Sequence, residues 1–257
     1  MCIRDRPILG ADLVEVVLAG GYPEAVARTR WARRQDWYLN YVDAIVQRDI
    51  RDIAEIEKAG ILPRLLRMMA EHSGQLTNFS ALGAQVDLNH VTTQKYVRLF
   101  ESLFLVETLP PWFSNRIKRL VKSPKLHFVD AGLLAALREL SPARVDRVAF
   151  GAVLETFVLS ELRKIATWSE ARPAFSHFRD KDGTEVDIVL ETRAGRIAGV
   201  EIKASATVGS GDFKGLRKLA EALGDRFVQG VVLYDGEQVV PFAENLFAVP
   251  LCALWGA

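Results

Sequence analysis

The order of elements in the carboxyl-terminal half constrains the fold of this chain more than any other feature. A helical pattern at residues 151–166 leads into three consecutive strand-like runs, and a second helix and further strands follow. This order predicts an α/β sandwich in place of a doubly wound repeat. The expected strands cover residues 175–179, 185–192, 196–204 and 229–234, with a helix at 212–223 and a last strand-like run at 246–254.

Two of these apolar runs, EVDIVLE and VEIKAS, carry charged residues where a strand should bury hydrophobic ones. Side chains alternate along a strand, so Glu201 and Lys203 share one face while Val200 and Ile202 share the other. Asp187 is expected to point away from its apolar neighbours in the same way. If the two strands pair antiparallel through the intervening RAG turn, Asp187 and Glu201 lie close together at one end of the sheet.

Two neighbouring carboxylates are costly without a counter-charge, because each raises the pKa of the other and burial raises both. A hard divalent cation removes that cost, and we expect Mg²⁺, with Mn²⁺ as an alternative, bound by Asp187 and Glu201. Lys203 would orient a water molecule or stabilise charge on a phosphoryl group. Glu155 lies beside the apolar stripe of the preceding helix and is the candidate for a third metal or water ligand. The alternative is a structural ion pair that is satisfied within the protein.

A second unit precedes this domain and has the pattern of a helix-turn-helix. Asn78 is expected to cap a short helix through Leu82, and Asn89 a longer one through about Leu103, because both side chains accept from free N–H groups. A strand-like hairpin follows, with a turn at Pro110 and Pro111, and completes a winged helix.

Basic and polar residues of this unit predict contact with DNA. The alternatives are a protein contact, or lysines that protect an edge strand from aggregation. The expected DNA-contacting residues on the second helix are Thr92, Thr93, Gln94, Lys95 and Arg98, and those on the hairpin are Arg116, Lys118, Arg119, Lys122 and Lys125.

Composition excludes several other classes of protein. The chain has 257 residues, 49% of them hydrophobic and 25% charged, which is typical of globular domains. The net charge of +1 means that any contact with nucleic acid depends on local patches. Cys2 and Cys252 lack the spacing of a zinc site or a disulfide framework. No apolar run is long enough to span a bilayer and no signal peptide is evident, so we expect a cytoplasmic protein without a membrane partner.

Glu155, Asp187 and the run Glu201-Ile202-Lys203, on a helix and two strands, resemble the PD-(D/E)xK nuclease superfamily. The resemblance implies a restriction-endonuclease-like core and gives these residues their catalytic roles. It departs from the family pattern at Val186, where the superfamily often has a proline.

The motifs GGYPEAV, QRDIRDI, GAVLETFVLSEL and VEIKAS, together with the winged helix, resemble the carboxyl-terminal part of prokaryotic AAA+ ATPases that carry the domain of unknown function 4143. Such ATPases have an amino-terminal module with a Walker motif, and no such motif occurs in this sequence. The resemblance therefore implies a fragment in which ATP binds only through the missing module, and in which the natural start lies upstream of MCIRDR.

The expected architecture is α/β: a helical connector and winged helix followed by a restriction-endonuclease-like α/β domain. The boundaries are residues 1–57 for the connector, 58–141 for the winged helix and 142–257 for the nuclease-like domain. The first functional hypothesis is a Mg²⁺-dependent nuclease that acts on DNA. The alternative is a regulator whose nuclease-like fold only binds DNA or a partner protein, and self-association stays open.

Overall fold

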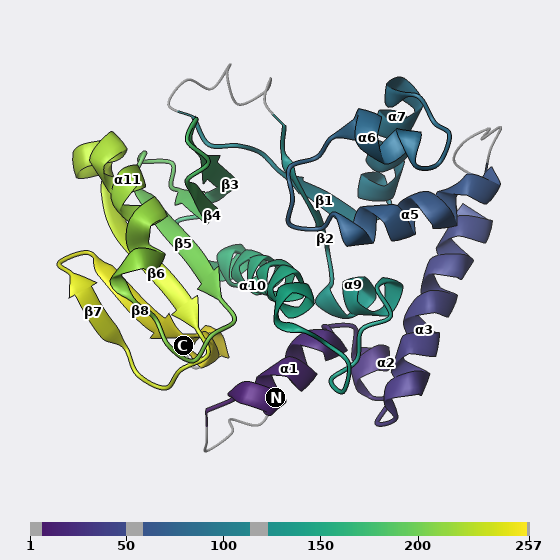
Figure 1. Ribbon diagram of the computed structural model, residues 1–257, viewed down its shortest axis with the longest axis horizontal. Helices are drawn as coiled ribbons and strands as arrows, with labels where there is room; N and C mark the ends of the chain where they lie inside the picture. The colour runs from purple at the N-terminus through teal and green to yellow at the C-terminus, as the bar shows by residue number, and fades with distance from the viewer. Residues whose placement is uncertain (1–6, 50–58, 114–122, 256–257) are drawn as a thin grey trace.

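The computed structural model describes residues 7–49, 59–113 and 123–255 (Figure 1). Four of the expected DNA-contacting residues, Arg116, Lys118, Arg119 and Lys122, lie outside the described residues. Across the described ranges, no helix combines the length and apolar character needed to cross a membrane.

The amino-terminal region is helical, with α1 (Gly10–Ala19), α2 (Pro23–Val26), α3 (Trp31–Ala44) and a π-helical extension η1 (Ile45–Asp49). Gly20 ends α1 with φ at 73°, and Pro23 opens α2 where its missing N–H costs nothing. The Gly21 N–H donates to Asp130 Oδ2 over 2.7 Å, which joins this region to the next unit.

The second unit contains the expected helix-turn-helix. Its elements are η2 (Ala59–Ile61), α5 (Leu62–Glu71), α6 (Phe79–Ala84), α7 (His90–Ser102), the antiparallel strands β1 (Val106–Leu109) and β2 (Lys125–Phe128), and α9 (Ala131–Leu137). Both predicted caps are confirmed, because Asn78 accepts from the Ala81 N–H over 3.0 Å and Asn89 accepts from the Thr92 N–H over 2.9 Å. A bridge between Leu76 and Lys125 places β2 between β1 and the chain before α6.

The third unit is a six-stranded mixed sheet between helices, and the expected α/β fold class is confirmed. The strand order is β3-β4-β5-β6-β8-β7, with β5, β6 and β8 parallel and the other pairs antiparallel. Its elements are α10 (Arg147–Trp168), β3 (Ala174–Arg179), β4 (Glu185–Glu191), β5 (Ile197–Lys203), η3 (Ser210–Phe213), α11 (Lys214–Leu223), η4 (Gly224–Arg226), β6 (Phe227–Tyr234), β7 (Val240–Ala243), β8 (Leu246–Pro250) and η5 (Leu251–Trp255).

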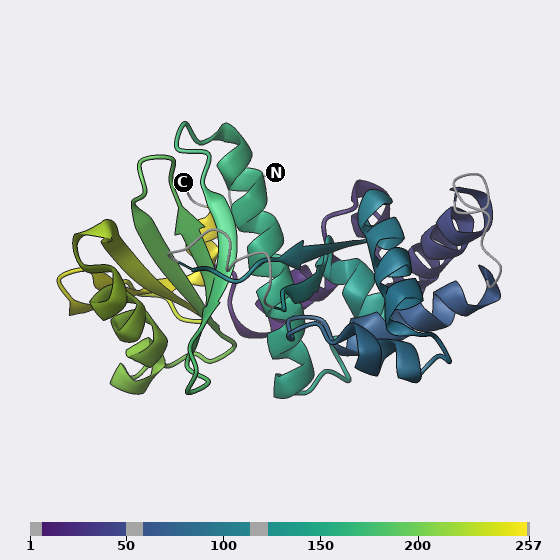
Figure 2. The ribbon, with the colours of Figure 1, turned by 90° about the horizontal axis from the view of Figure 1, so that it is seen from above.

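The sheet has α11 on its outer face and α10 on its inner face, between the sheet and the amino-terminal helices (Figure 2). The α10 side of the sheet belongs to a large core that continues into α1, α3, α5 and α7. The α11 side has its own smaller core around Phe213 and Leu216. This large core contains residues from all three expected domains, so it does not mark boundaries between them. The domain boundaries therefore stay a prediction.

Strand β4 contains an irregularity next to Asp187. Pairing with β3 shifts register there, so Ser176 lies opposite Val189 while Phe178 lies opposite Val186. As a result Val186 packs in the core beside α11, whereas Ile188 packs in the core beside α10. The expectation that Asp187 points away from both of these neighbours is therefore wrong, because a bulge changes the face on which β4 presents its side chains.

Candidate functional site

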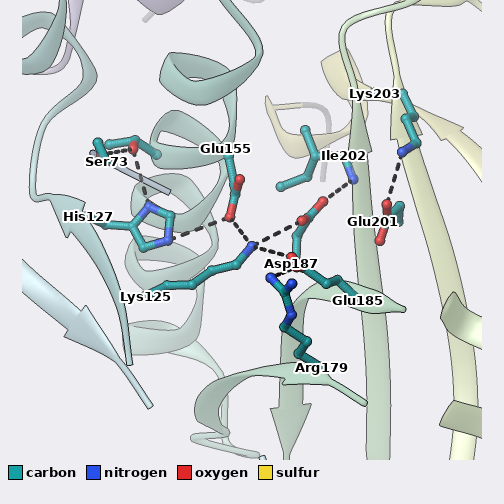
Figure 3. Close-up of polar contacts among 11 residues, drawn as sticks. Ser73, Lys125, His127, Glu155, Arg179, Glu185, Asp187, Glu201, Ile202 and Lys203 are labelled. Carbon is teal, nitrogen blue, oxygen red and sulfur yellow. Dashed lines mark hydrogen bonds and ion pairs between the residues drawn. The ribbon is translucent and has the colours of Figure 1, made fainter. Parts of the chain in front are cut away.

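Four predicted site residues come from three elements that meet at one end of the sheet. Glu155 lies on α10, Asp187 on β4, and Glu201 and Lys203 on β5 (Figure 3). The ladder between β4 and β5 runs only to the pair Ile188 and Val200. Beyond it, Asp187 Oδ2 accepts the Ile202 N–H over 3.0 Å, so a carboxylate satisfies a backbone group that the ladder leaves free.

Lys125 is the centre of the site. Its Nζ lies 2.9 Å from Glu155 Oε1, 3.4 Å from Asp187 Oδ1 and 3.6 Å from Glu185 Oε2 (Figure 3). Lys125 is only 3% exposed. We call these four residues the Lys125 cluster. The expectation that Lys125 contacts DNA from the hairpin surface is corrected, because β2 directs this side chain inward against α10 and β4.

The charged groups of the Lys125 cluster shift the pKa values of one another. Burial by itself lowers the pKa of Lys125, but the carboxylates of Glu155 and Asp187 outweigh it and raise that pKa above its ordinary value. Burial raises the pKa of Glu155 above its usual range, and the charge of Asp187 adds to this effect while Lys125 opposes it. The ammonium is therefore the counter-ion that offsets two acids in a desolvated place.

Glu201 and Lys203 form a neighbouring pair, with Lys203 Nζ 3.0 Å from Glu201 Oε1 (Figure 3). Burial, and then the charge of Asp187, raises the pKa of Glu201. Its second oxygen, Oε2, is buried and has no hydrogen-bond partner. Lys203 is more accessible than Lys125, because 34% of its side chain is exposed.

Glu155 packs against Gly74 and lies near a short polar network that contains His127 and Thr156. A Cβ at Gly74 would lie 3.1 Å from Glu155 Oε2, and φ there is 79°, so both space and backbone conformation favour glycine. His127 is fully buried; its Nδ1 lies 3.3 Å from the Thr156 hydroxyl and its Nε2 3.6 Å from Glu155 Oε1. Burial, assisted by Lys125, lowers the pKa of His127 to about 3, so this ring is neutral at physiological pH.

The chain after β1 docks the hairpin onto the sheet. The Trp112 N–H donates to the His177 carbonyl over 2.6 Å, and the His177 N–H donates to the Pro110 carbonyl over 2.9 Å. The Trp112 indole also donates to Glu191 Oε2 over 3.3 Å, and its ring joins the core beside α11. The segment that follows β1 is therefore attached to edge strand β3.

The expected DNA-contacting face of α7 is retained in part. Lys95 and Arg98 are exposed, and Thr92 and Gln94 are half-buried. Thr93 is fully buried and its hydroxyl donates to the Asn89 carbonyl over 2.8 Å. The prediction for Thr93 is corrected, because its hydroxyl supports the start of α7 against Gly83 and has no exposed surface to offer.

The acids of the site provide the type of ligand atom that a hard cation prefers. Glu155, Asp187 and Glu201 supply carboxylate oxygens, and Glu201 Oε2 has no protein partner. Among the residues that the structure describes, no three His, Cys, Asp or Glu side chains are already arranged to hold a metal ion. Lys125 lies between two of the three acids, and its ammonium provides the positive charge there.

Sequence reasoning placed neither Lys125, Glu185 nor His127 in this site. One signal was present: in the hairpin run KLHF, a lysine and a histidine alternate with leucine and phenylalanine. All four residues of β2 are buried, so the polar members of the run point into the protein interior. Polar side chains in a wholly buried strand need partners, and here the partners are on α10 and β4.

The fold and the site define an α/β protein in which strand β2, after a helix-turn-helix, places a lysine among acids of helix α10 and a mixed sheet. This chain belongs to the family described as domain of unknown function DUF8612, whose model matches residues 10–144. The domain of unknown function DUF4143 is also present, matching residues 150–254. The DUF4143 part of the predicted resemblance is thus confirmed.

Two curated relatives are uncharacterized proteins of Mycobacterium bovis and Mycobacterium tuberculosis. Each is 28% identical over 257 residues, which cover 97% of this chain and 55% of the relative. The chain thus spans about half the length of the curated relatives that it matches. A solved assembly of Thermococcus gammatolerans McrB AAA+ hexamers with bound McrC matches 74% of this chain and 46% of the other, at 11% identity and a TM-score of 0.28.

Proposed function

We propose that residues 142–257 form a Mg²⁺-dependent phosphodiesterase domain that acts on DNA, with Mn²⁺ as an alternative ion. The observation that carries this proposal is the convergence of Glu155, Asp187 and Glu201 from three separate elements, with Lys203 beside them. The coupling between these acids supports it, because the charge of Asp187 raises the pKa of both Glu155 and Glu201.

Asp187, Glu201 and Glu155 would hold the cation through their carboxylates. When bound, Mg²⁺ would supply Lewis-acid stabilisation of negative charge on the scissile phosphate. Lys203 is the residue best placed to meet substrate, since its ammonium is partly exposed and is held by Glu201. Its role is to orient the attacking water or to stabilise a phosphoryl oxygen. The Ile202 N–H fixes Asp187 Oδ2, which orients that carboxylate.

Cleavage of DNA is the direct test. Purified protein with Mg²⁺ or Mn²⁺ should cleave DNA, and Asp187→Asn and Lys203→Ala should each lower the rate by about a hundredfold or more. Asp180→Asn is the matched control, since Asp180 directly follows β3 and pairs with Lys218 outside the Lys125 cluster. Equal rates for wild type and Asp187→Asn on both DNA and RNA would remove the catalytic proposal.

Binding to duplex DNA is a separate part of the proposal and is supported by the exposed Lys95 and Arg98 on α7. Affinity should fall steeply as salt concentration rises, and Lys95→Ala and Arg98→Ala should each reduce that salt dependence by roughly one phosphate contact. Binding that does not depend on salt would overturn the DNA assignment.

The second candidate is a regulator in which the sheet domain only binds DNA or a partner protein. The burial of Lys125 among the acids favours it, because the cluster is then already neutralised in part by the protein itself. Wild-type DNA binding without cleavage at any Mg²⁺ or Mn²⁺ concentration would select this candidate.

We also infer that the chain is the carboxyl-terminal part of an AAA+ ATPase, so that ATP is bound by a module outside this sequence. The DUF4143 match and the greater length of the curated relatives support this inference. The coding sequence upstream tests it, because a P-loop motif is expected there.

A further inference from the structure

We propose that Lys125 is a tethered cation that closes the acid site, so that a divalent ion binds only when the ammonium withdraws. This inference rests on the proposed function, since it assigns regulation to the same carboxylates. It concerns a residue of β2, which the proposed chemistry does not otherwise use.

The acids that contact Lys125 are proposed metal ligands. The two oxygens nearest to Lys125 Nζ belong to Glu155 and Asp187, at 2.9 and 3.4 Å. These are two of the three side chains that would hold the metal ion. A carboxylate oxygen that faces an ammonium at this distance cannot face a divalent ion in the same place, so the two cations compete.

Lys125 is more deeply buried than the acids around it. The Lys125 side chain is 4% exposed, while the side chains of Glu155 and Asp187 are each 16% exposed. The acids are thus reached by solvent more readily than the lysine between them. An ion could approach the carboxylates from that exposed side, but full coordination requires the ammonium to move.

Withdrawal of the Lys125 ammonium has an energetic cost. Removing a buried ammonium leaves acids without a counter-ion, which is strongly unfavourable. A divalent cation replaces the lost charge and offsets that penalty, whereas water does not. Metal binding and withdrawal of Lys125 are therefore coupled, and each should promote the other.

Lys125 belongs to a different part of the fold from the acids that it contacts. Lys125 begins β2, and its backbone pairs with Leu109 on one side and bridges Leu76 on the other. The chain after β1 is fixed to β3 through His177. Lys125 thus reaches the site from a different unit, and its contacts with Glu155 and Asp187 connect the state of that unit to the acids (Figures 1 and 3).

Lys125→Met tests the competition, because methionine removes the charge with little change in length. We expect Mn²⁺, titrated by calorimetry, to bind Lys125→Met at least about tenfold more tightly than wild type, which corresponds to about 1.4 kcal/mol. Lys218→Met is the matched control, because Lys218 also lies between two acids, Asp180 and Asp182, outside the cluster. Affinity in Lys125→Met equal to or weaker than that of wild type would overturn the proposal.

A measurement on wild type avoids any loss of folding in the variant. An amine-acylating reagent with mass-spectrometric readout should leave Lys125 unmodified without metal and modify it at saturating Mn²⁺, while Lys218 reacts equally in both conditions. Lys125 that stays protected with Mn²⁺ bound would contradict the competition.

The two proposals fail in different ways. If Asp187→Asn abolishes Mn²⁺ binding and metal-dependent cleavage is present, but Lys125→Met binds no better than wild type, competition by Lys125 is wrong and the proposed function stands. If Lys125→Met binds Mn²⁺ more tightly through Asp187 but no variant cleaves DNA or RNA, the competition stands and the proposed activity is wrong.

Discussion

Two lysines of this protein lie between acidic side chains, and their surroundings differ. Lys125 contacts Glu155 and Asp187 and has a side chain that is 4% exposed. Lys218 on α11 contacts Asp180 and Asp182, with its side chain 38% exposed. We call the second group the Lys218 cluster. The number of near acids is similar, but of the two lysines only Lys125 is buried.

Contact geometry alone therefore does not set the energetic weight of an ion pair. Water screens the Lys218 cluster, and either side chain can exchange its partner for solvent. In the Lys125 cluster, a charge that loses its partner stays in a desolvated place. The two lysines therefore offer matched substitutions with different expected outcomes.

Stability should respond most strongly to the loss of the Lys125 charge. Lys125→Met should lower the free energy of unfolding by about 3–5 kcal/mol, because it leaves Glu155 and Asp187 buried without their counter-ion. Lys218→Met should change it little. Urea denaturation of both variants measures the difference, and equal losses would show that burial does not separate the two clusters.

The next effect concerns pH and His177, which is 1% exposed. Burial, and then the charge of Lys125, lowers the pKa of His177 from 6.5 to about 4. Between these values the unfolded chain binds a proton that the folded protein does not, so stability is complete above pH 6.5 and falls as the pH drops toward 4. Each pKa unit corresponds to about 1.4 kcal/mol, which gives a loss of about 3 kcal/mol from this group.

Lys125→Met should raise the pKa of His177 toward its ordinary value and so reduce this pH dependence, whereas Lys218→Met should leave it unchanged. NMR titration of the His177 ring reports the pKa directly. A pKa of His177 that is the same in wild type and Lys125→Met would show that burial alone keeps the ring neutral.

The smallest effect is the response to salt. In about 1 M NaCl the small difference between Lys218→Met and wild type should vanish, because screening acts over a few ångströms at that concentration. The larger deficit of Lys125→Met should persist. Thermal unfolding at low and high salt compares the two, and a Lys125→Met deficit that disappears with salt would place the Lys125 cluster in contact with solvent.

Local sequence signals were sufficient for most of the fold. Asn78 and Asn89 cap the predicted helices because capping involves only residues three apart. The strands from 174 to 203 follow from their apolar runs. Strand β7 was missed, because its apolar run VPFA is only four residues long and contains Pro241, which argues against a strand.

The candidate site was predictable only as far as it lies on one domain. Asp187, Glu201 and Lys203 could be placed from strand periodicity, although the bulge in β4 changed which neighbours Asp187 opposes. Lys125 could not, because its contact with Asp187 joins residues 62 positions apart in different units. Alternation within β2 showed only that the lysine and histidine share a face, and the identity of the opposing acids depends on tertiary packing.

The attachment of the hairpin at His177 also closes an edge of the sheet. Strand β3 is an outer strand, and both backbone groups of His177 bond to the segment that contains Pro110 and Trp112. The opposite outer strand, β7, is four residues long and includes Pro241, which has no N–H to donate. The middle of one border is therefore occupied and the other border is short, and both features hinder growth of the sheet by addition of a strand from another copy.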